Sequence, residues 1–185
     1  QDDVFWRWSA QIAQGVADMH RSGLLHLALH VNRSLCTQLL SSDDAFSAQA
    51  GTIALNAQGD VRIANFSRSC LAKEINSHNP VTYPEDAKYQ APEDAPGSFS
   101  FASDMFSVAV ILFKMVTGKL PDPNNLDRDH LLATIDDPCK NELISFALHA
   151  DPSTRPPAEE LLQKITTLAP SSRLESQFRA QVFAS

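Results

Sequence analysis

One stretch of the chain is apolar on nearly every face. Between Phe106 and Val116, only Ser107 and Lys114 interrupt a run of apolar residues. The run is too long for a typical strand, so it predicts a helix that protein encloses on almost all sides. With about eleven residues and an internal lysine, it falls well short of the roughly 20 residues needed to cross a bilayer. We expect this buried helix to be the centre of the fold.

Shorter amphipathic patterns lie on both sides of the apolar run. In the first, apolar residues recur at helical spacing from Val4 onwards, until Gly23 ends the pattern. Asp137 and Pro138 form a favourable N-cap and first-turn pair for another helix. Predicted helices cover residues 3–22, 126–135, 137–148 and 158–168, and a capping-box sequence opens a further helical segment at residue 172.

The rest of the chain predicts little regular structure. Residues 52–56 and 61–64 have the pattern of two short strands joined by a turn that contains Gly59. Residues 34–51 are mostly small and polar, as in an exposed insertion. Residues 65–100 carry several prolines and no sustained period, and a loop of this length in a compact domain is usually functional. The predicted fold class is therefore mainly α with a small β-hairpin.

Composition favours an intracellular globular domain. The chain has 185 residues, enough for one domain with a sizeable core. Its 15 basic and 22 acidic residues give a formal charge of −7, and the basic residues are scattered, which argues against a nucleic-acid partner. Three cysteines without CxxC spacing favour free thiols in a reducing compartment. We find no signal-peptide pattern and expect a cytoplasmic protein with no membrane partner.

Four short motifs occur in a particular order. Residues 58–66 read QGDVRIANF, residues 89–93 read YQAPE, residues 103–110 read SDMFSVAV, and residues 151–156 read DPSTRP. In this order and at these separations, they resemble the C-terminal lobe (C-lobe) of a eukaryotic protein kinase. Each motif alone is weak, but together they span most of the chain. The resemblance implies a kinase-like C-lobe around the buried central helix.

The resemblance also implies how the chain is divided. The C-lobe would cover residues 1–168, with an insertion at about 34–51 and an activation-segment-like loop at 65–93. Residues 169–185 would form a C-terminal helical extension. The chain contains no GxGxxG sequence and no VAIK-like stretch, which belong to the N-terminal lobe (N-lobe) in this family. We therefore expect the N-lobe to be absent from this chain.

Five residues match positions that keep the kinase fold together. Glu93 and Arg155 resemble the buried ion pair that ties the activation segment to the lobe. Asp104 resembles the aspartate of the central helix that holds the backbone of the catalytic loop. His26 and Phe66 match the histidine of the HRD motif and the phenylalanine of the DFG motif. The resemblance gives all five residues a structural role.

The positions that carry the chemistry in this family differ. Phosphoryl transfer uses a carboxylate that accepts the proton of the attacking hydroxyl and oxygen ligands that hold Mg²⁺. Ala28 occupies the position of the proton acceptor, and Asn65 that of the metal-binding aspartate. The catalytic-loop asparagine falls on Arg33, or on Thr52 if the insertion precedes that position. From these degenerate positions we expect no catalytic residues and a chain that is not an enzyme.

The expected function is that of a pseudokinase-like scaffold. It would be catalytically inactive and act as a protein-interaction or structural subunit of a larger assembly. Partner proteins would cover the vacant N-lobe face. A stripe on the terminal segment, formed by Leu174, Phe178 and Val182, would dock either on the lobe itself or on a partner. The alternative is a divergent active Ser/Thr-type protein kinase whose N-lobe lies outside this chain.

No bound cofactor or metal ion is expected. His26 and His30 with Cys36 could suggest metal ligands, because histidines at i and i+4 on a helix have ligand spacing. The segment is not convincingly helical and lacks a third ligand at a defined spacing. Histidines that are hydrogen-bonded in the core are the favoured interpretation.

Overall fold

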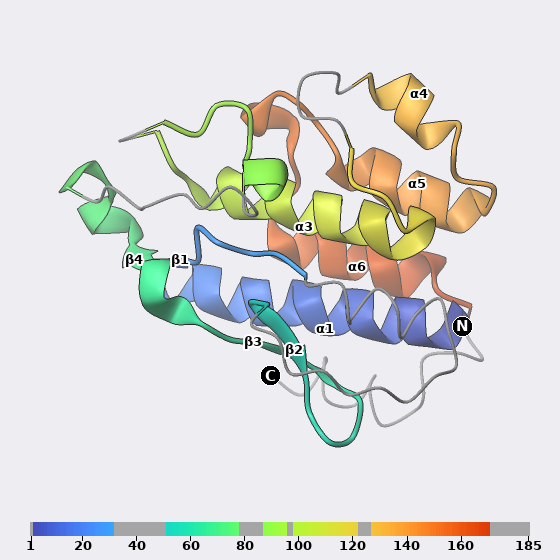
Figure 1. Ribbon diagram of the computed structural model, residues 1–185, viewed down its shortest axis with the longest axis horizontal. Helices are drawn as coiled ribbons and strands as arrows, with labels where there is room; N and C mark the ends of the chain where they lie inside the picture. The colour runs from blue at the N-terminus through green and yellow to red at the C-terminus, as the bar shows by residue number, and fades with distance from the viewer. Residues whose placement is uncertain (1, 32–50, 78–86, 96–97, 122–126, 171–185) are drawn as a thin grey trace.

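The computed structural model describes residues 2–31, 51–77, 87–95, 98–121 and 127–170 (Figure 1). Five of the residues singled out in the sequence lie outside these ranges, so what was predicted for them stays a prediction. They are Arg33, Cys36, Leu174, Phe178 and Val182. The same holds for nearly all of the predicted insertion and for most of the terminal extension.

Helix α3, Phe101–Thr117, is the buried central helix that the apolar run predicts. It begins at a capping box in which the side chains of Ser100 and Ser103 each accept from the other's backbone. It ends at Gly118, whose φ of 72° is the left-handed conformation that favours glycine. All residues from 103 to 113 are buried. The prediction of a helix enclosed by protein is confirmed.

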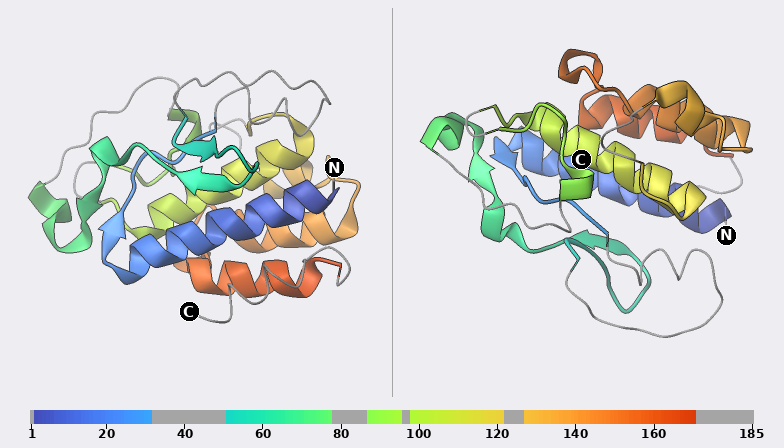
Figure 2. Two further views of the ribbon diagram at one scale, coloured as in Figure 1. Left: turned by 90° about the horizontal axis from the view of Figure 1, so that it is seen from below. Right: turned by 45° about the horizontal axis from the view of Figure 1, so that its top comes forward.

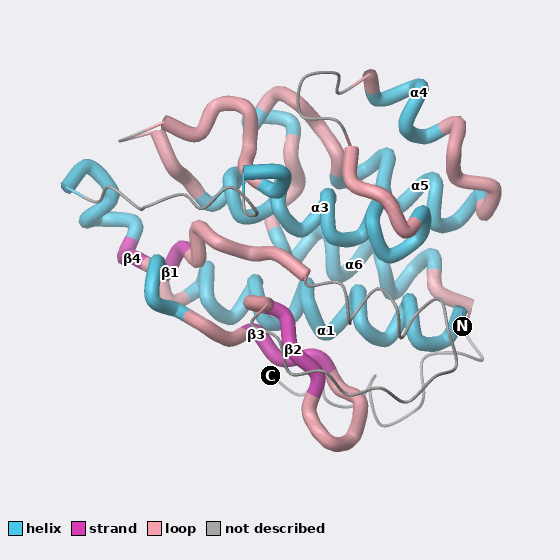
Figure 3. The backbone as a smooth tube through the Cα atoms, viewed as in Figure 1, coloured by secondary structure: helices cyan, strands magenta, loops and turns pink. Residues whose placement is uncertain are grey.

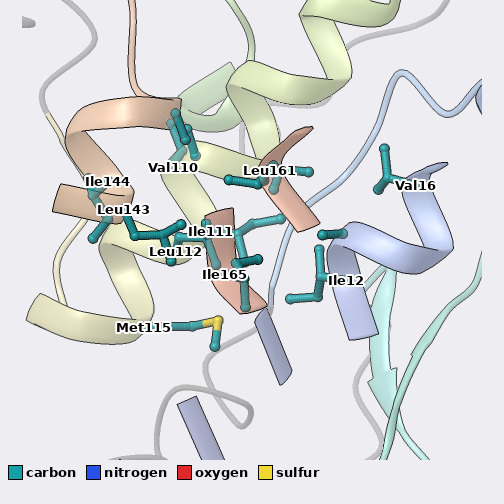
Figure 4. Packing of buried hydrophobic residues seen from close by; sticks show 14 of the residues in the cluster. Ile12, Val16, Val110, Ile111, Leu112, Met115, Leu143, Ile144, Leu161 and Ile165 are labelled. Atoms are coloured by element: carbon teal, nitrogen blue, oxygen red, sulfur yellow. The ribbon is translucent and has the colours of Figure 1, made fainter. Parts of the chain in front are cut away.

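The other helices pack around α3. Helix α1, Asp2–Arg21, lies beside both α3 and α6, Ala158–Leu168 (Figures 1 and 2). Helix α5, Pro138–Ala147, packs on α3 and α6, and the short α4, Arg128–Leu132, packs on α5. Side chains of four helices meet in this core, among them Ile12, Ile111, Leu143 and Ile165 (Figure 4). The helices predicted around 3–22, 137–148 and 158–168 are therefore confirmed.

The predicted hairpin is present and rests on α1. Strands β2, Ile53–Leu55, and β3, Val61–Ile63, pair antiparallel around a turn that contains Gly59. The indole Nε1 of Trp8 donates to the Gly59 carbonyl at 2.9 Å. A Cβ atom on Gly15 would lie 2.8 Å from Cδ1 of Ile63, so a side chain at position 15 would require the Ile63 side chain to shift. The hairpin is thereby fixed to the first helix.

A second strand pair was not predicted. Strands β1, Leu24–Leu25, and β4, Cys70–Leu71, pair antiparallel near the end of α1 (Figure 3). Each strand has two residues, too few to carry an alternating pattern. The described parts of segment 65–100 also contain short 3₁₀ turns at 66–68, 72–77 and 87–89. The fold is thus mostly helical with small antiparallel sheets.

None of the helices in the described ranges combines the length and the apolar character needed to span a membrane.

Candidate functional site

The site is built around Asp104, in the first turn of α3. This carboxylate is 1% exposed, and its Oδ2 and Oδ1 atoms accept from the backbone N–H groups of His26 and Leu27, both at 2.8 Å. Nε2 of His20, at the end of α1, lies 3.1 Å from Oδ2. Several hydrogen-bond donors and the N-terminal end of a helix both stabilise the negative charge of a buried carboxylate. Asp104 thus fixes the loop that leads to Ala28.

The loop held by Asp104 has an unusual backbone. Leu27 has a φ of 63°, a conformation that costs a bulky residue on the order of 1–3 kcal/mol. Its N–H is bound by Asp104, and its carbonyl accepts from the guanidinium of Arg68 at 3.0 Å. The peptide groups on both sides of Leu27 are therefore held by a buried carboxylate and a half-buried guanidinium. These contacts stabilise the conformation that places Ala28.

Thr52 holds the same loop from the hairpin side. Its hydroxyl lies 3.0 Å from the carbonyl of Ala28 and accepts from the N–H of His30 at 2.8 Å. The sequence left either Arg33 or Thr52 for the position of the catalytic-loop asparagine. Thr52 contacts the backbone of Ala28, and Arg33 lies outside the described residues, so the assignment of this position stays a prediction.

His26 and Phe66 lie against each other, one buried and one exposed. His26 is fully buried, its Nε2 lies 3.1 Å from the carbonyl of Ala64, and its ring centroid is 5.2 Å from that of Phe66. Burial lowers the pKa of His26, and the nearby charge of Asp104 opposes this shift. Phe66 is 45% exposed. The exposed ring of Phe66 therefore packs against the buried, hydrogen-bonded imidazole of His26.

The side chains of Ala28 and Asn65 are small and uncharged. Ala28 presents a methyl group, which can neither accept a proton nor bind a metal ion. The Oδ1 atom of Asn65 accepts from the Ser67 hydroxyl at 2.8 Å, and the backbone of Asn65 is left-handed with a φ of 59°. Within the described ranges, no three His, Cys, Asp or Glu side chains gather as metal ligands. Neither position therefore supplies a carboxylate that could accept a proton or bind a metal ion.

Glu93 and Arg155 form a bidentate ion pair near the start of α3. The two guanidinium nitrogens donate to the two carboxylate oxygens at 2.5 and 2.8 Å, and the arginine side chain is fully buried. Arg155 also donates to the carbonyls of Ala102, His149 and Ala150. The pair ties the turn at 91–94 to α3 and to the segment that precedes α6.

A small cavity lies between the Ala28 loop, the turn at 91–94 and α3. Its volume is about 10 Å³, room for roughly one water molecule. Its lining includes Ala28, Arg68, Asp94 and Asp104. Burial raises the pKa of Asp94 to about 6, against the opposing effect of the Ser103 side chain. Sequence reasoning missed Asp94, because nothing in the local pattern shows that one of its carboxyl oxygens is buried.

The protein kinase domain model matches residues 1–182 of the chain. A serine/threonine-protein kinase of Saccharomyces cerevisiae is 29% identical over 174 residues, which are 92% of this chain and 13% of that protein. A membrane-associated tyrosine- and threonine-specific cdc2-inhibitory kinase of Drosophila melanogaster is 23% identical over 169 residues, 87% of this chain and 28% of that protein. A proline-rich receptor-like protein kinase of Arabidopsis thaliana is 30% identical over 97 residues, 51% of this chain and 14% of that protein. The chain therefore spans between about an eighth and a quarter of these relatives' length.

These matches correct one expectation. The prediction that the chain is not an enzyme is wrong, because the matched model covers almost the whole chain and the relatives are named as kinases. That prediction rested on the side chains at Ala28, Asn65 and the position of the catalytic-loop asparagine. A phosphoryl-transfer site combines many groups from both lobes, so substitutions at a few positions do not remove a chain from the enzyme family.

The ion pair of Arg155 leads to a testable prediction. Arg155→Ala would leave the Glu93 carboxylate without its partner in a largely buried site, and we expect a loss of about 3–5 kcal/mol in unfolding free energy. Arg21→Ala is the matched control, because Arg21 pairs with Asp18 on the exposed face of α1. Its expected cost is below about 1 kcal/mol. Urea unfolding would measure both, and equal costs would contradict the structural role of the buried pair.

Proposed function

Because this chain belongs to the protein kinase domain family, we propose that it binds partner proteins as an interaction or structural subunit of a larger assembly. In this proposal, residues 1–168 form a kinase-like C-lobe, and residues 169–185 form an extension that offers a second contact. The partner covers the face around Phe66. The exposed ring of Phe66 on its buried support is the observation that carries the proposal.

The packing of Phe66 on His26 is suited to binding a partner. Fully burying a phenylalanine side chain contributes about 1.5–3 kcal/mol, and aromatic residues are enriched where interfaces are most tightly packed. Binding loses less conformational entropy when the contact residue is already held in place. The ring of Phe66 packs on His26, and the backbone of His26 is hydrogen-bonded to Asp104. The ring therefore presents a partly ordered apolar contact.

The uncharged side chains at positions 28 and 65 favour the same role. A carboxylate at position 28 or 65 would have to lose water when a partner covers it, which costs several kcal/mol unless a cation compensates. The methyl group of Ala28 and the amide of Asn65, which is hydrogen-bonded to Ser67, avoid most of that cost. The site can therefore be covered by a partner at less cost than one with two carboxylates.

The terminal extension is proposed as the second contact. Leu174, Phe178 and Val182 recur every four residues, the spacing of one apolar stripe on a helix. An amphipathic helix of this kind docks in a hydrophobic groove of a partner protein. Contact through both the Phe66 face and this stripe would strengthen binding by linking two sites on one chain.

Footprinting with hydroxyl radicals tests the proposal in the full-length protein. The oxidation rate of Phe66 would be compared between the purified protein and its native assembly. We expect the ring to be several-fold less reactive in the assembly, because a partner covers it. Trp6, which is 1% exposed, is the control for intact folding and should stay unreactive in both samples. Equal reactivity of Phe66 in the two samples would contradict the proposed interface.

A second experiment measures what positions 28 and 65 contribute to chemistry. In the full-length protein, Ala28→Asp combined with Asn65→Asp would supply a proton acceptor and a metal-binding carboxylate. We expect phosphoryl transfer from labelled ATP with Mg²⁺ to rise by at least about 100-fold relative to the unsubstituted protein. Ala28→Asn is the matched control, similar in size but without charge. Unchanged transfer in the double variant would show that these positions do not limit the reaction.

A further inference from the structure

Asp94 is a half-buried residue whose carboxyl uses only part of its hydrogen-bonding capacity. It closes a turn in which its N–H donates to the carbonyl of Ala91 at 3.0 Å and its Oδ2 accepts from the N–H of Ala91 at 3.2 Å. Its Oδ1 is buried and has no hydrogen-bond partner among the described residues. An ionised carboxylate in such a position costs free energy, because the side chain of Ser103 compensates only part of the desolvation.

The charged groups around Asp94 offer little compensation. Glu93 precedes it in the same turn, and its negative charge disfavours a second one nearby. Arg155, from the segment before α6, favours the ionised form, but its guanidinium is already bound to Glu93 and to three backbone carbonyls. Arg68, which donates to the carbonyl of Leu27, and Asp104, which holds two backbone N–H groups, line the same cavity. The surroundings therefore favour a neutral carboxyl.

We propose that Asp94 is a proton-operated switch that tightens the turn at 91–94 in mildly acidic conditions. Protonation removes the buried charge and turns one carboxyl oxygen into a donor, which the cavity beside Ala28 can satisfy with one water molecule. Ionisation restores a charge that its surroundings compensate only in part, and it loosens the turn that carries Glu93. Because Leu27, Ala28 and Leu29 line the same cavity, the switch acts on two loops that meet at α3.

The direction of the pH dependence follows from the shift of Asp94. Its pKa is about 6 in the folded protein and 3.8 in the absence of the fold, so the folded state holds the proton more tightly. The stabilising contribution is fully present below about pH 3.8 and is lost as the pH rises through about 6. A carboxylate stabilised by an ion pair contributes more stability as the pH rises, whereas the contribution of Asp94 falls. This opposite sign distinguishes Asp94 from the ion-paired carboxylates.

The test compares the full chain with Asp94→Asn between pH 4.5 and 7.5. The amide stays neutral at every pH, so we expect the unfolding equilibrium constant of the variant, relative to the unsubstituted chain, to fall on the order of 10-fold or more as the pH rises. Taking this ratio cancels the contributions of His26 and His149, whose pKa values are lowered by burial. Asp136→Asn, at an exposed position, controls for the loss of one negative charge.

Hydrogen exchange provides a local measurement that needs no variant. In the unsubstituted chain, the amides of Ala91 and Asp94 should be more protected at pH 5 than at pH 7.5 after correction for intrinsic exchange, whereas amides of the buried part of α3 should not follow this trend. Protection of the turn that does not change with pH would overturn the proposal. The proposal would also be overturned if Asp94→Asn and Asp136→Asn responded to pH in parallel.

Discussion

The backbone N–H groups of His26 and Leu27 are buried, and both donate to the carboxylate of Asp104. A buried N–H without a partner costs about 1–3 kcal/mol, and this loop has no helix or sheet partner for these two groups. A carboxylate can accept both, and the buried position 104 in the first turn of α3 is one from which it can do so. The position of the loop therefore follows from the position of the central helix.

Other parts of the site also meet at the N-terminal end of α3. Arg155 donates to Ala102 in the first turn and holds Glu93, while Ser107 donates to the carbonyl of Tyr89. The site is consequently a junction of loops fixed to one buried helix, rather than a set of independent side chains. Such a junction provides a firm base for an exposed group such as Phe66. In the switch proposed above, the same junction lets Asp94 act on two loops, because both line one cavity.

The sequence predicted the elements that have a pattern of their own. The helices α1, α3, α5 and α6 follow from the spacing of apolar residues, and the β2–β3 hairpin follows from its turn at Gly59. Asp104 and Arg155 were chosen from a resemblance in motifs, since periodicity says nothing about which buried polar groups meet. Strands β1 and β4, the contact of Thr52 with the Ala28 backbone, and the burial of Asp94 all depend on tertiary packing. The incorrect prediction about enzyme class came from judging a whole domain by a few side chains.

Native-state hydrogen exchange at His26 and Leu27 tests most directly whether α3 holds this loop. If Asp104 binds both N–H groups as described, these amides should exchange only through global or near-global opening, with protection close to that of the buried amides in the middle of α3. Exchange at rates typical of an exposed loop would contradict the account, because the loop would then open without the helix that is said to fix it.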